Sequence, residues 1–140
     1  EYACEGDASQ LGERIATYMT SLSCGNAVYI FGGELTVNAS KSRGVGGPSM
    51  EVALKVAVLG AGLPDWALLA YSTDGRDGPT LGAGAVVDGT SAARMKSRGV
   101  DPIKALAHHD SFVAHQRAGT LIKTGPTGTN VNHIYVLLRQ

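Results

Sequence analysis

The sequence predicts a single α/β domain, a three-layer arrangement in which a mixed, mostly parallel sheet is flanked by helices. Strand-like segments alternate with helical ones along the chain, as is typical of this class. The segment ALLAYS, at 67–72, is almost continuously apolar, as a strand buried on both faces would be. A length of 140 residues suits one domain, and we find no repeat or linker that would divide the chain.

The first half of the chain is predicted to contain two helices and two strands. Apolar side chains recur at helical spacing in two segments, and Asp7 or Ser9 is available to cap the first of them. Gly32 and Gly33 are expected to end the first strand. In chain order, the predicted elements are a helix over 7–22, a strand over 27–31, a short strand over 35–37, a loop over 41–49 and a helix from Met50 to Gly60 or Gly62.

The second half is predicted to contain three strands and three short helices. Asp101 precedes Pro102 and Asp110 precedes Ser111, so both aspartates are expected to cap helices. In chain order, the predicted elements are the strand over 67–72, a glycine-rich loop (TDGRDGPTLGAG), a helix ending at Gly99, a helix from Asp101-Pro102, a helix from Asp110-Ser111 to about Arg117, and two final strands in TLIK and IYVLL, which are either separate or paired.

Composition and charge exclude several classes of protein. Hydrophobic residues make up 44% and charged residues 17% of the chain, which fits a globular rather than a disordered protein. Twelve basic and twelve acidic residues cancel, so no net positive field argues for nucleic acid or an anionic membrane. No membrane-span-length apolar segment or cysteine framework is present, so a cytoplasmic location is expected. Because the first residue is Glu1 and not methionine, a natural start upstream stays open.

Two loops that follow predicted strands carry unusual polar chemistry. The loop at 41–49 places Lys41 and Arg43 beside glycines and a helix start, which together suit an anion. A plain glycine-rich connection is the alternative. In the loop after ALLAYS, Asp74 and Asp77 suit Mg²⁺ or the proton of a hydroxyl group. A pair of Asx turns is the alternative there.

A third loop, TGPTGTNVN at 124–132, is longer than a turn between two strands requires. Its threonine hydroxyls and glycine amides suit phosphate or carboxylate oxygens, although Gly-Pro and Thr-Gly pairs also form turns. We interpret it as the wall of a ligand pocket. Because ligands of open α/β sheets bind beyond the carboxyl ends of strands, the three loops are expected at one edge of the sheet. The four histidines lack a metal-ligand spacing and are interpreted as solvated or capping side chains.

Five segments in this order resemble the MOFRL domain: FGGELTV, RGVGGPSMEVAL, ALLAYSTDGRDGPT, GAGAVVDGTSAAR and TGPTGTNVNHIYVLL. This is the C-terminal domain of class II glycerate 2-kinases, a family that is also named hydroxypyruvate reductase. The resemblance is strongest over 27–138 and makes 1–140 one MOFRL-like domain. It implies transfer of the γ-phosphoryl group of ATP to the 2-hydroxyl of D-glycerate, across a cleft from a larger N-terminal nucleotide-binding domain that is absent from this chain.

The resemblance also implies ligands and site residues. Mg²⁺ and ATP are expected only when the N-terminal domain is present, and neither is expected to bind the isolated chain. Members usually carry a GGRNQE-like segment, in which Pro48, Ser49 and Met50 here replace a basic residue and two amides. The implied catalytic residues are Asp74, Asp77 and Glu34, of which the two aspartates are also metal ligands. The implied substrate or phosphate contacts are Arg43, Glu51, Thr80, Thr127, Gly128, Thr129 and Asn130.

Two functions of different classes stay open on the sequence alone. The chain is either half of the interdomain active site of a glycerate 2-kinase, or a stand-alone, non-catalytic MOFRL-like protein that binds a small anion or a protein partner. The intact acidic and TGPTGTN loops favour the kinase, whereas the altered GGPSME segment favours the stand-alone protein. A homo-oligomer is compatible with both. A reductase is not favoured, because no GxGxxG follows a strand.

Overall fold

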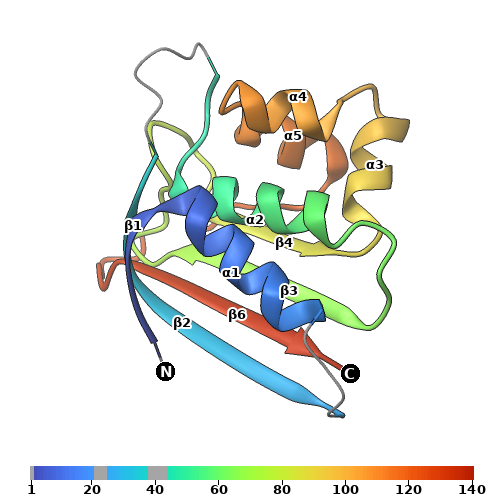
Figure 1. Ribbon diagram of the computed structural model, residues 1–140. Helices are drawn as coiled ribbons and strands as arrows, with labels where there is room; N and C mark the ends of the chain where they lie inside the picture. The colour runs from blue at the N-terminus through green and yellow to red at the C-terminus, as the bar shows by residue number, and fades with distance from the viewer. Residues whose placement is uncertain (1, 21–24, 38–43) are drawn as a thin grey trace.

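A six-stranded mixed sheet forms the base of the fold, with the strand order β1-β2-β6-β3-β4-β5 (Figure 1). The computed structural model describes residues 2–20, 25–37 and 44–140. The strands are β1 (Tyr2–Asp7), β2 (Ala27–Thr36), β3 (Trp66–Ser72), β4 (Gly84–Asp88), β5 (Leu121–Ile122) and β6 (His133–Arg139).

Most neighbouring strands are antiparallel, so the prediction of a mostly parallel sheet is wrong. In the described part of the chain, β1 and β2 form the one parallel pair, and the other four pairs are antiparallel. The reason is insertion of two strands. The last strand, β6, lies between β2 and β3, and β4 lies between β3 and β5, and both run opposite to their neighbours. A strand-like sequence pattern does not determine which strands become neighbours in the sheet.

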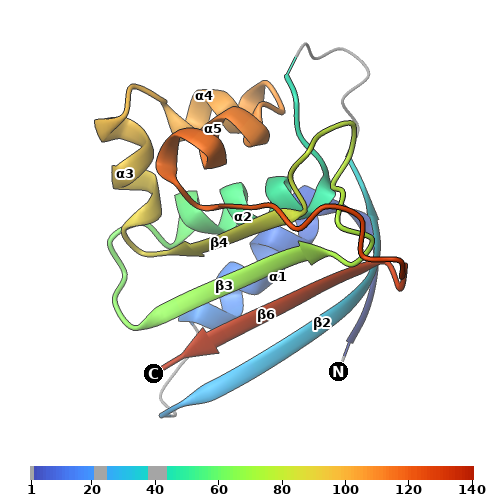
Figure 2. The same cartoon turned by 180° about the vertical axis from the view of Figure 1, so that it is seen from behind.

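The helices of the described chain lie on one face of the sheet (Figures 1 and 2), which differs from the predicted three-layer arrangement. They are α1 (Ala8–Thr20), α2 (Pro48–Leu59), α3 (Ser91–Ser97), α4 (Pro102–Ala107) and α5 (Ser111–Ala118). Side chains of α1 and α2 form the main core with the sheet. The three short helices pack on the far side of α2, where Leu54, Met95 and Ala114 belong to a second buried cluster.

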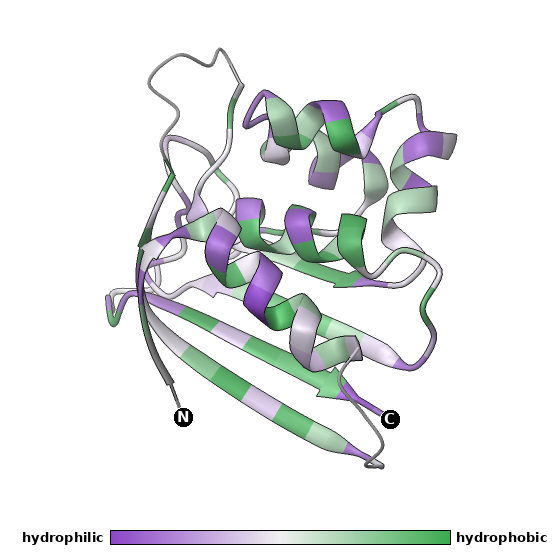
Figure 3. Ribbon diagram, in the orientation of Figure 1, coloured by the Kyte–Doolittle hydropathy of each residue, from purple (hydrophilic) through white to green (hydrophobic). Residues whose placement is uncertain are grey.

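The opposite face of the sheet is open, yet it is also apolar. Along β3, every second residue from Trp66 to Ser72 is buried beneath the helices, and the residues between them are partly exposed. On the open face, Val28 and Ile30 of β2 are 61% and 52% exposed, and Leu138 of β6 is 46% exposed. Figure 3 shows hydrophobic residues recurring along these strands. This explains why ALLAYS reads as a strand buried on both faces although only one face is covered.

Two strands of the structure, β1 and β4, were not predicted from the sequence. β1 precedes α1, and β4 occupies part of the segment that follows the glycine-rich loop. The predicted strands at 27–31 and 35–37 form one strand, β2, because Gly32 and Gly33 continue it instead of ending it. At Gly33 the backbone lies so close to β1 that an added Cβ would be 1.8 Å from the carbonyl oxygen of Cys4. Glycine here permits close packing of two strands.

The predicted helices are all present, and of the three aspartates named as possible caps two are confirmed. Asp7 accepts the N–H of Ser9 at 2.8 Å at the start of α1. Asp101 accepts hydrogen bonds from the N–H groups of Ile103 and Lys104, at 3.0 and 3.2 Å, and so caps α4. Asp110 does not cap α5; its carboxylate instead accepts the N–H of Val45 at 3.2 Å. Within the described residues, no helix combines the length and the apolar character that a membrane span requires.

Candidate functional site

Four strands, β1, β2, β3 and β5, end at the same edge of the sheet, which we call the loop edge. Three loops meet here: the first loop (44–47), the second loop (73–83) and the third loop (123–132). The N–H of Thr127 donates to the carbonyl of Asp74 at 3.3 Å, which joins the third loop to the second. Gly47 of the first loop packs directly on Asp77 of the second. The predicted convergence of the loops is therefore confirmed, whereas Lys41 and Arg43 lie outside the described residues.

Asp77 caps helix α2 from the inside of the protein. The N–H groups of Ser49 and Met50 donate to its two carboxylate oxygens at 3.1 and 2.7 Å. These N–H groups have no partner within the helix, and the positive end of the helix dipole favours an anion. The anion expected at this helix start is thus the protein's own carboxylate. Burial raises the pKa of Asp77 to about 6, while the two N–H bonds lower it. With 0% exposure and both oxygens engaged, Asp77 does not fit the predicted contact with metal or substrate.

Asp74 lies in the same loop but faces a pocket. It lines a cavity of 320 Å³ together with Arg76, Leu81, Gly125 and other residues of the second and third loops. One carboxylate oxygen accepts the N–H of Arg76 at 2.9 Å, which is the Asx turn of the alternative interpretation. The side chain nevertheless remains partly exposed. Asp74 is therefore the aspartate of this loop that can reach a ligand.

The carboxylates of Glu34 and Asp74 both affect the imidazole of His133, which begins β6 at the loop edge. Burial lowers the pKa of His133, and the carboxylates of Asp74 and Glu34 oppose that shift. His133 Nδ1 accepts the N–H of Leu35 at 3.4 Å, which leaves Nε2 as the hydrogen-bearing nitrogen of the neutral ring. Glu34 itself is exposed at the end of β2.

A complete metal site is not present in the described part of the chain, which contains no group of three His, Cys, Asp or Glu side chains arranged around one ion. Mg²⁺ commonly binds one or two carboxylates together with water and substrate phosphates. Asp74 fits such a single carboxylate, and Asp77 does not. The predicted Mg²⁺ would therefore depend on ligands from phosphates or from a further domain.

The buried Glu51 and the partly exposed His109 form a hydrogen-bonded pair in a second cavity at the loop edge. Glu51 lies in the first turn of α2, and its Oε1 is 2.9 Å from Nδ1 of His109. The cavity has a volume of 420 Å³ and is walled by Gly46, Gly47 and Pro48, among others. Burial raises the pKa of Glu51, and the hydrogen bond and charge of His109 oppose it. The resemblance implied a cleft position for Glu51, but His109 was interpreted as solvated or capping and was missed.

The third loop is exposed over its whole length, and its side chains mainly shape the loop. Gly125 and Gly128 have φ of +70° and +77°, a conformation that other residues rarely adopt. Asn130 Oδ1 accepts the N–H of Asn132 at 3.0 Å, as expected for a residue that holds a curve. The hydroxyl of Thr127 donates to the carbonyl of Thr73 rather than facing a ligand. The exposed Thr129 and Gly128 remain accessible.

Thr80 supports the second loop from within. Its hydroxyl donates to the carbonyl of Asp77 at 2.8 Å and accepts the N–H of Gly82 at 3.0 Å. Thr80 is 6% exposed, so its predicted role as a substrate contact is indirect at most. Glycines tighten the same region: an added Cβ on Gly75 would lie 1.9 Å from the carbonyl oxygen of Gly125. The glycine-rich composition thus serves contacts between loops as much as contacts with a ligand.

Thr127→Val is expected to lower the free energy of unfolding by about 1 kcal/mol, because it removes the hydroxyl that ties the third loop to Thr73. Thr129→Val is the matched control and should change it by less than about 0.5 kcal/mol, as exposed side chains usually do. Urea denaturation of the two variants measures both effects. Equal stabilities would show that the Thr127 hydroxyl does not hold the loop.

His115 is a structural histidine that sequence reasoning also missed. It is 0% exposed, with Nδ1 2.8 Å from the Thr120 hydroxyl and Nε2 2.9 Å from the carbonyl oxygen of Met50. Burial lowers its pKa to about 4, so the ring is neutral at pH 7. Because the carbonyl of Met50 accepts, Nε2 carries the hydrogen and Nδ1 accepts from Thr120. No motif marks this residue in the sequence, since its partners come from α2 and from the start of β5.

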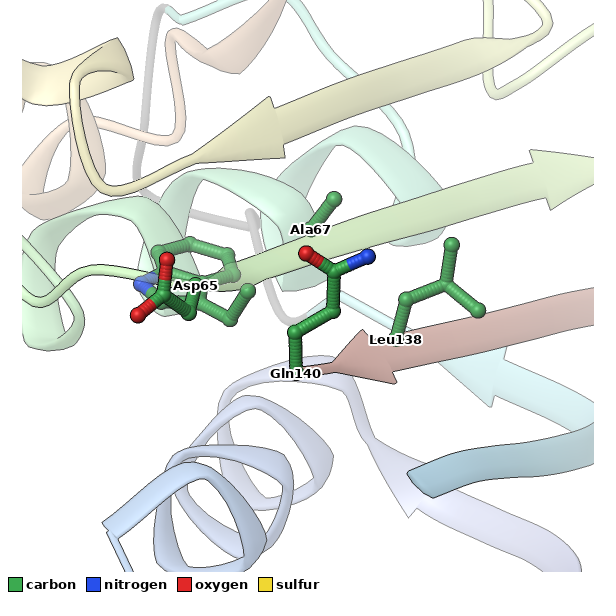
Figure 4. Close-up of a pocket in the computed structure, with 5 residues that line it drawn as sticks. Asp65, Ala67, Leu138 and Gln140 are labelled. Atoms are coloured by element: carbon green, nitrogen blue, oxygen red, sulfur yellow. The ribbon is translucent and has the colours of Figure 1, made fainter. Parts of the chain in front are cut away.

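A further pocket lies at the opposite end of the strands (Figure 4). It has a volume of 270 Å³ and is lined by Asp65, Trp66, Ala67, Leu138 and Gln140. These residues flank the start of β3 and the end of β6, whereas the loop edge lies where β3 ends and β6 begins. Because the predicted site residues gather at the loop edge, that edge is the candidate site.

Comparison with known proteins identifies the family of the chain. The model of the MOFRL family matches residues 27–133. D-glycerate 2-kinase of Thermotoga maritima is 40% identical over 136 residues, which cover 93% of this chain and 32% of that protein. Glycerate 2-kinase of Pyrococcus horikoshii is 44% identical, covering 79% of this chain and 25% of that protein. The crystal structure of glycerate kinase from Thermotoga maritima superposes with a TM-score of 0.92 and 38% identity, over 100% of this chain and 36% of that one.

Proposed function

The chain belongs to the MOFRL family and spans about a third of the Thermotoga glycerate kinase that it matches, and on this premise we propose that it forms one half of the active site of an ATP-dependent D-glycerate 2-kinase. The other half would come from a second, nucleotide-binding domain. In this reading the substrate is glycerate or a close hydroxy acid, and the loop edge faces the cleft.

The observation that carries the proposal is the meeting of three loops at one edge, where they line two cavities of 320 and 420 Å³. The second loop contributes to both, with Asp74 on one side and Gly78 on the other. Ligand sites typically combine such concavity with a few convergent polar groups. Asp74 and the Glu51–His109 pair supply these groups here.

Phosphoryl transfer explains why this half would need a partner. The reaction depends on positioning the nucleotide and on neutralising charge at the transferring phosphoryl group. In the described chain, both long helices, α1 and α2, begin at the loop edge, and the carboxylates of Asp7 and Asp77 already accept N–H groups at these helix starts. The triphosphate would therefore be held chiefly by the second domain, with Asp74 as the available carboxylate for Mg²⁺.

Expression of the complete reading frame that encodes this chain tests the proposal. We expect Mg²⁺-dependent phosphorylation of D-glycerate by the complete protein and none by the 140-residue chain. Asp74→Asn should lower kcat/KM at least about 100-fold, which corresponds to roughly 2.7 kcal/mol of transition-state stabilisation. The amide keeps the acceptor of the Asx turn, so the fold should be retained. Full activity of Asp74→Asn would remove Asp74 from the site.

A stand-alone protein that binds a protein partner is the second candidate, and the open face of the sheet favours it. Val28, Ile30 and Leu138 expose large apolar surface on adjacent strands, which typically marks an interaction site. A reading frame that begins close to Glu1, together with absent kinase activity, would support this candidate over the kinase.

A further inference from the structure

We infer that His109 is the group that accepts the proton of the substrate hydroxyl, and that Glu51 positions it; the inference rests on the proposed function. The two side chains are joined by a hydrogen bond of 2.9 Å between Glu51 Oε1 and His109 Nδ1. Both line the 420 Å³ cavity at the loop edge. They come from distant parts of the chain, the first turn of α2 and the turn before α5.

The hydrogen bond determines which nitrogen of His109 is free. An ionised carboxylate can only accept, so Nδ1 must carry the hydrogen of this bond. In the neutral ring, Nε2 is then an acceptor, and the structure records no protein partner for it in the described part of the chain. The side chain of Glu51 is 4% exposed and that of His109 is 31% exposed. A buried carboxylate thus stands behind a histidine that reaches the cavity, as in sites where a histidine acts as a general base.

The backbone of His109 is held in a conformation that needs support. Its φ is 53°, in the left-handed region that residues with a Cβ seldom adopt. The first loop packs tightly on this turn, since an added Cβ on Gly44 would lie 2.0 Å from the carbonyl oxygen of His108. The N–H of Phe112 also donates to the carbonyl of Val45 at 2.9 Å. These contacts support a backbone conformation that costs energy, and residues held in this way cluster at active sites and ligand contacts.

Charge indicates which part of a ligand faces His109. The described lining residues of the cavity include no lysine or arginine, and Glu51 leaves a negative charge beside the imidazole. The charge of Glu51 also contributes to the raised pKa of the buried Asp77, so a second acidic group lies near this cavity. A neutral hydroxyl can donate to Nε2 there, and the nearby negative charge favours transfer of its proton to the imidazole. The assigned ligand group is therefore the hydroxyl of a hydroxy acid.

The chemical step follows from this geometry. The O–H bond of the substrate breaks, and its proton passes to Nε2 of His109. The hydroxyl oxygen forms a bond to the γ-phosphorus of a nucleoside triphosphate, the bond from that phosphorus to the bridging oxygen breaks, and the nucleoside diphosphate leaves. The imidazolium is stabilised by Glu51 and later releases the proton to water. A general base of this kind contributes on the order of 100-fold or more.

Two substitutions separate catalysis from structure in the protein expressed from its complete reading frame. His109→Asn keeps an N–H near the position of Nδ1, so it can still bond to Glu51, but it lacks Nε2. His109→Gln places an amide near the position of Nε2 and loses the contact with Glu51. We expect His109→Asn to lower kcat about 100-fold with KM within about threefold, and to flatten the acidic limb of the kcat/KM profile. His108→Asn, the adjacent exposed histidine, is the matched control.

Both variants retain Glu51 and the neighbouring acidic groups Asp7, Asp77 and Asp110. These groups therefore do not account for a difference between the pH profiles of kcat/KM. If His109→Asn keeps wild-type kcat while His109→Gln loses stability, the pair is structural and the inference is overturned. If the wild-type protein shows no turnover, the proposed kinase function is contradicted. The role of His109 is then tested by a second measurement that does not depend on turnover.

That measurement is ¹⁵N NMR of the histidine rings in the 140-residue chain at pH 8, with His109→Asn used for assignment. We expect hydrogen on Nδ1 of His109, a loss of this preference in Glu51→Ala, and a shift of the Nε2 resonance when D-glycerate is added. Hydrogen on Nε2, or glycerate-induced shifts confined to the ring of His133, would overturn the inference.

Discussion

Asp77→Ala is expected to lower the free energy of unfolding by about 3 kcal/mol at pH 7.5. The substitution removes the cap of α2, which typically costs about 1–2 kcal/mol, and strands the N–H groups of Ser49 and Met50 in a buried site. Since burial raises the pKa of Asp77 to about 6, the carboxylate is ionised at this pH and accepts both bonds. Urea denaturation followed by circular dichroism measures the change.

Two further variants sharpen this result. Asp77→Asn should give an intermediate loss, because the amide oxygen accepts one N–H while its NH₂ group opposes the other. Asp74→Asn, three residues earlier in the same loop, should change stability by less than about 0.5 kcal/mol, since its acceptor for Arg76 is retained. If Asp74→Asn and Asp77→Ala were equally destabilising, the assignment of Asp77 as an internal cap would fail.

Asp74 and Asp77 show where sequence reasoning on the site reaches its limit. Asp74 precedes a glycine and so does Asp77, and the motif treats them as a pair. In the folded protein, Asp77 is buried against the start of α2, whereas Asp74 lines a cavity. The difference is made by Ser49 and Met50, which lie more than twenty positions earlier in the chain. The composition of the loops was enough to predict that they meet at one edge of the sheet. Which aspartate of the second loop is buried depends on how that loop packs against α2, and no local sequence pattern encodes this packing.

The same limit applies to the sheet. Helical periodicity and caps predicted every helix, because these signals lie within a few residues of each other. Strand order depends on contacts between segments far apart, such as the insertion of β6 between β2 and β3. Apolar residues on the open face, Val28 and Ile30 among them, further concealed that only one face is covered. Composition cannot separate a face covered by helices from an apolar face left open.

A hydrogen-bonded chain joins the candidate site to α5 and to Thr120 before β5. The N–H of Met50 donates to Asp77, the carbonyl of Met50 accepts from His115, and His115 accepts from Thr120. The start of α2 is therefore fixed at once to the second loop and to α5. The cavity with Glu51 and His109 is built on this turn of α2. The buried side chains of Asp77 and His115, which hold the turn in place, should therefore affect the shape of the cavity.

The stability cost of His115→Gln is expected to shrink by about 2–3 kcal/mol between pH 7.5 and pH 4.5. Burial lowers the pKa of His115 from 6.5 to about 4, so the unfolded state binds more protons in this range. The contribution of His115 is fully present above pH 6.5 and is lost as the pH falls through 4. The shift of about 2.5 pKa units, at about 1.4 kcal/mol each, sets the size of the effect.

Comparing the variant with the wild type isolates this group from Asp77, whose influence has the opposite sign. The pKa of Asp77 rises from 3.8 to about 6 on folding, so proton binding stabilises the folded state at low pH, and this pH-dependent part is lost as the pH rises through 6. The two N–H bonds to the carboxylate remain above that pH. The two groups largely cancel in the wild-type profile, and only the difference between wild type and His115→Gln exposes the histidine. Urea denaturation at both pH values, with His108→Gln as the exposed control, measures that difference. An equal cost of His115→Gln at pH 7.5 and 4.5 would mean that His115 titrates as an exposed histidine does, contrary to its burial between Met50 and Thr120.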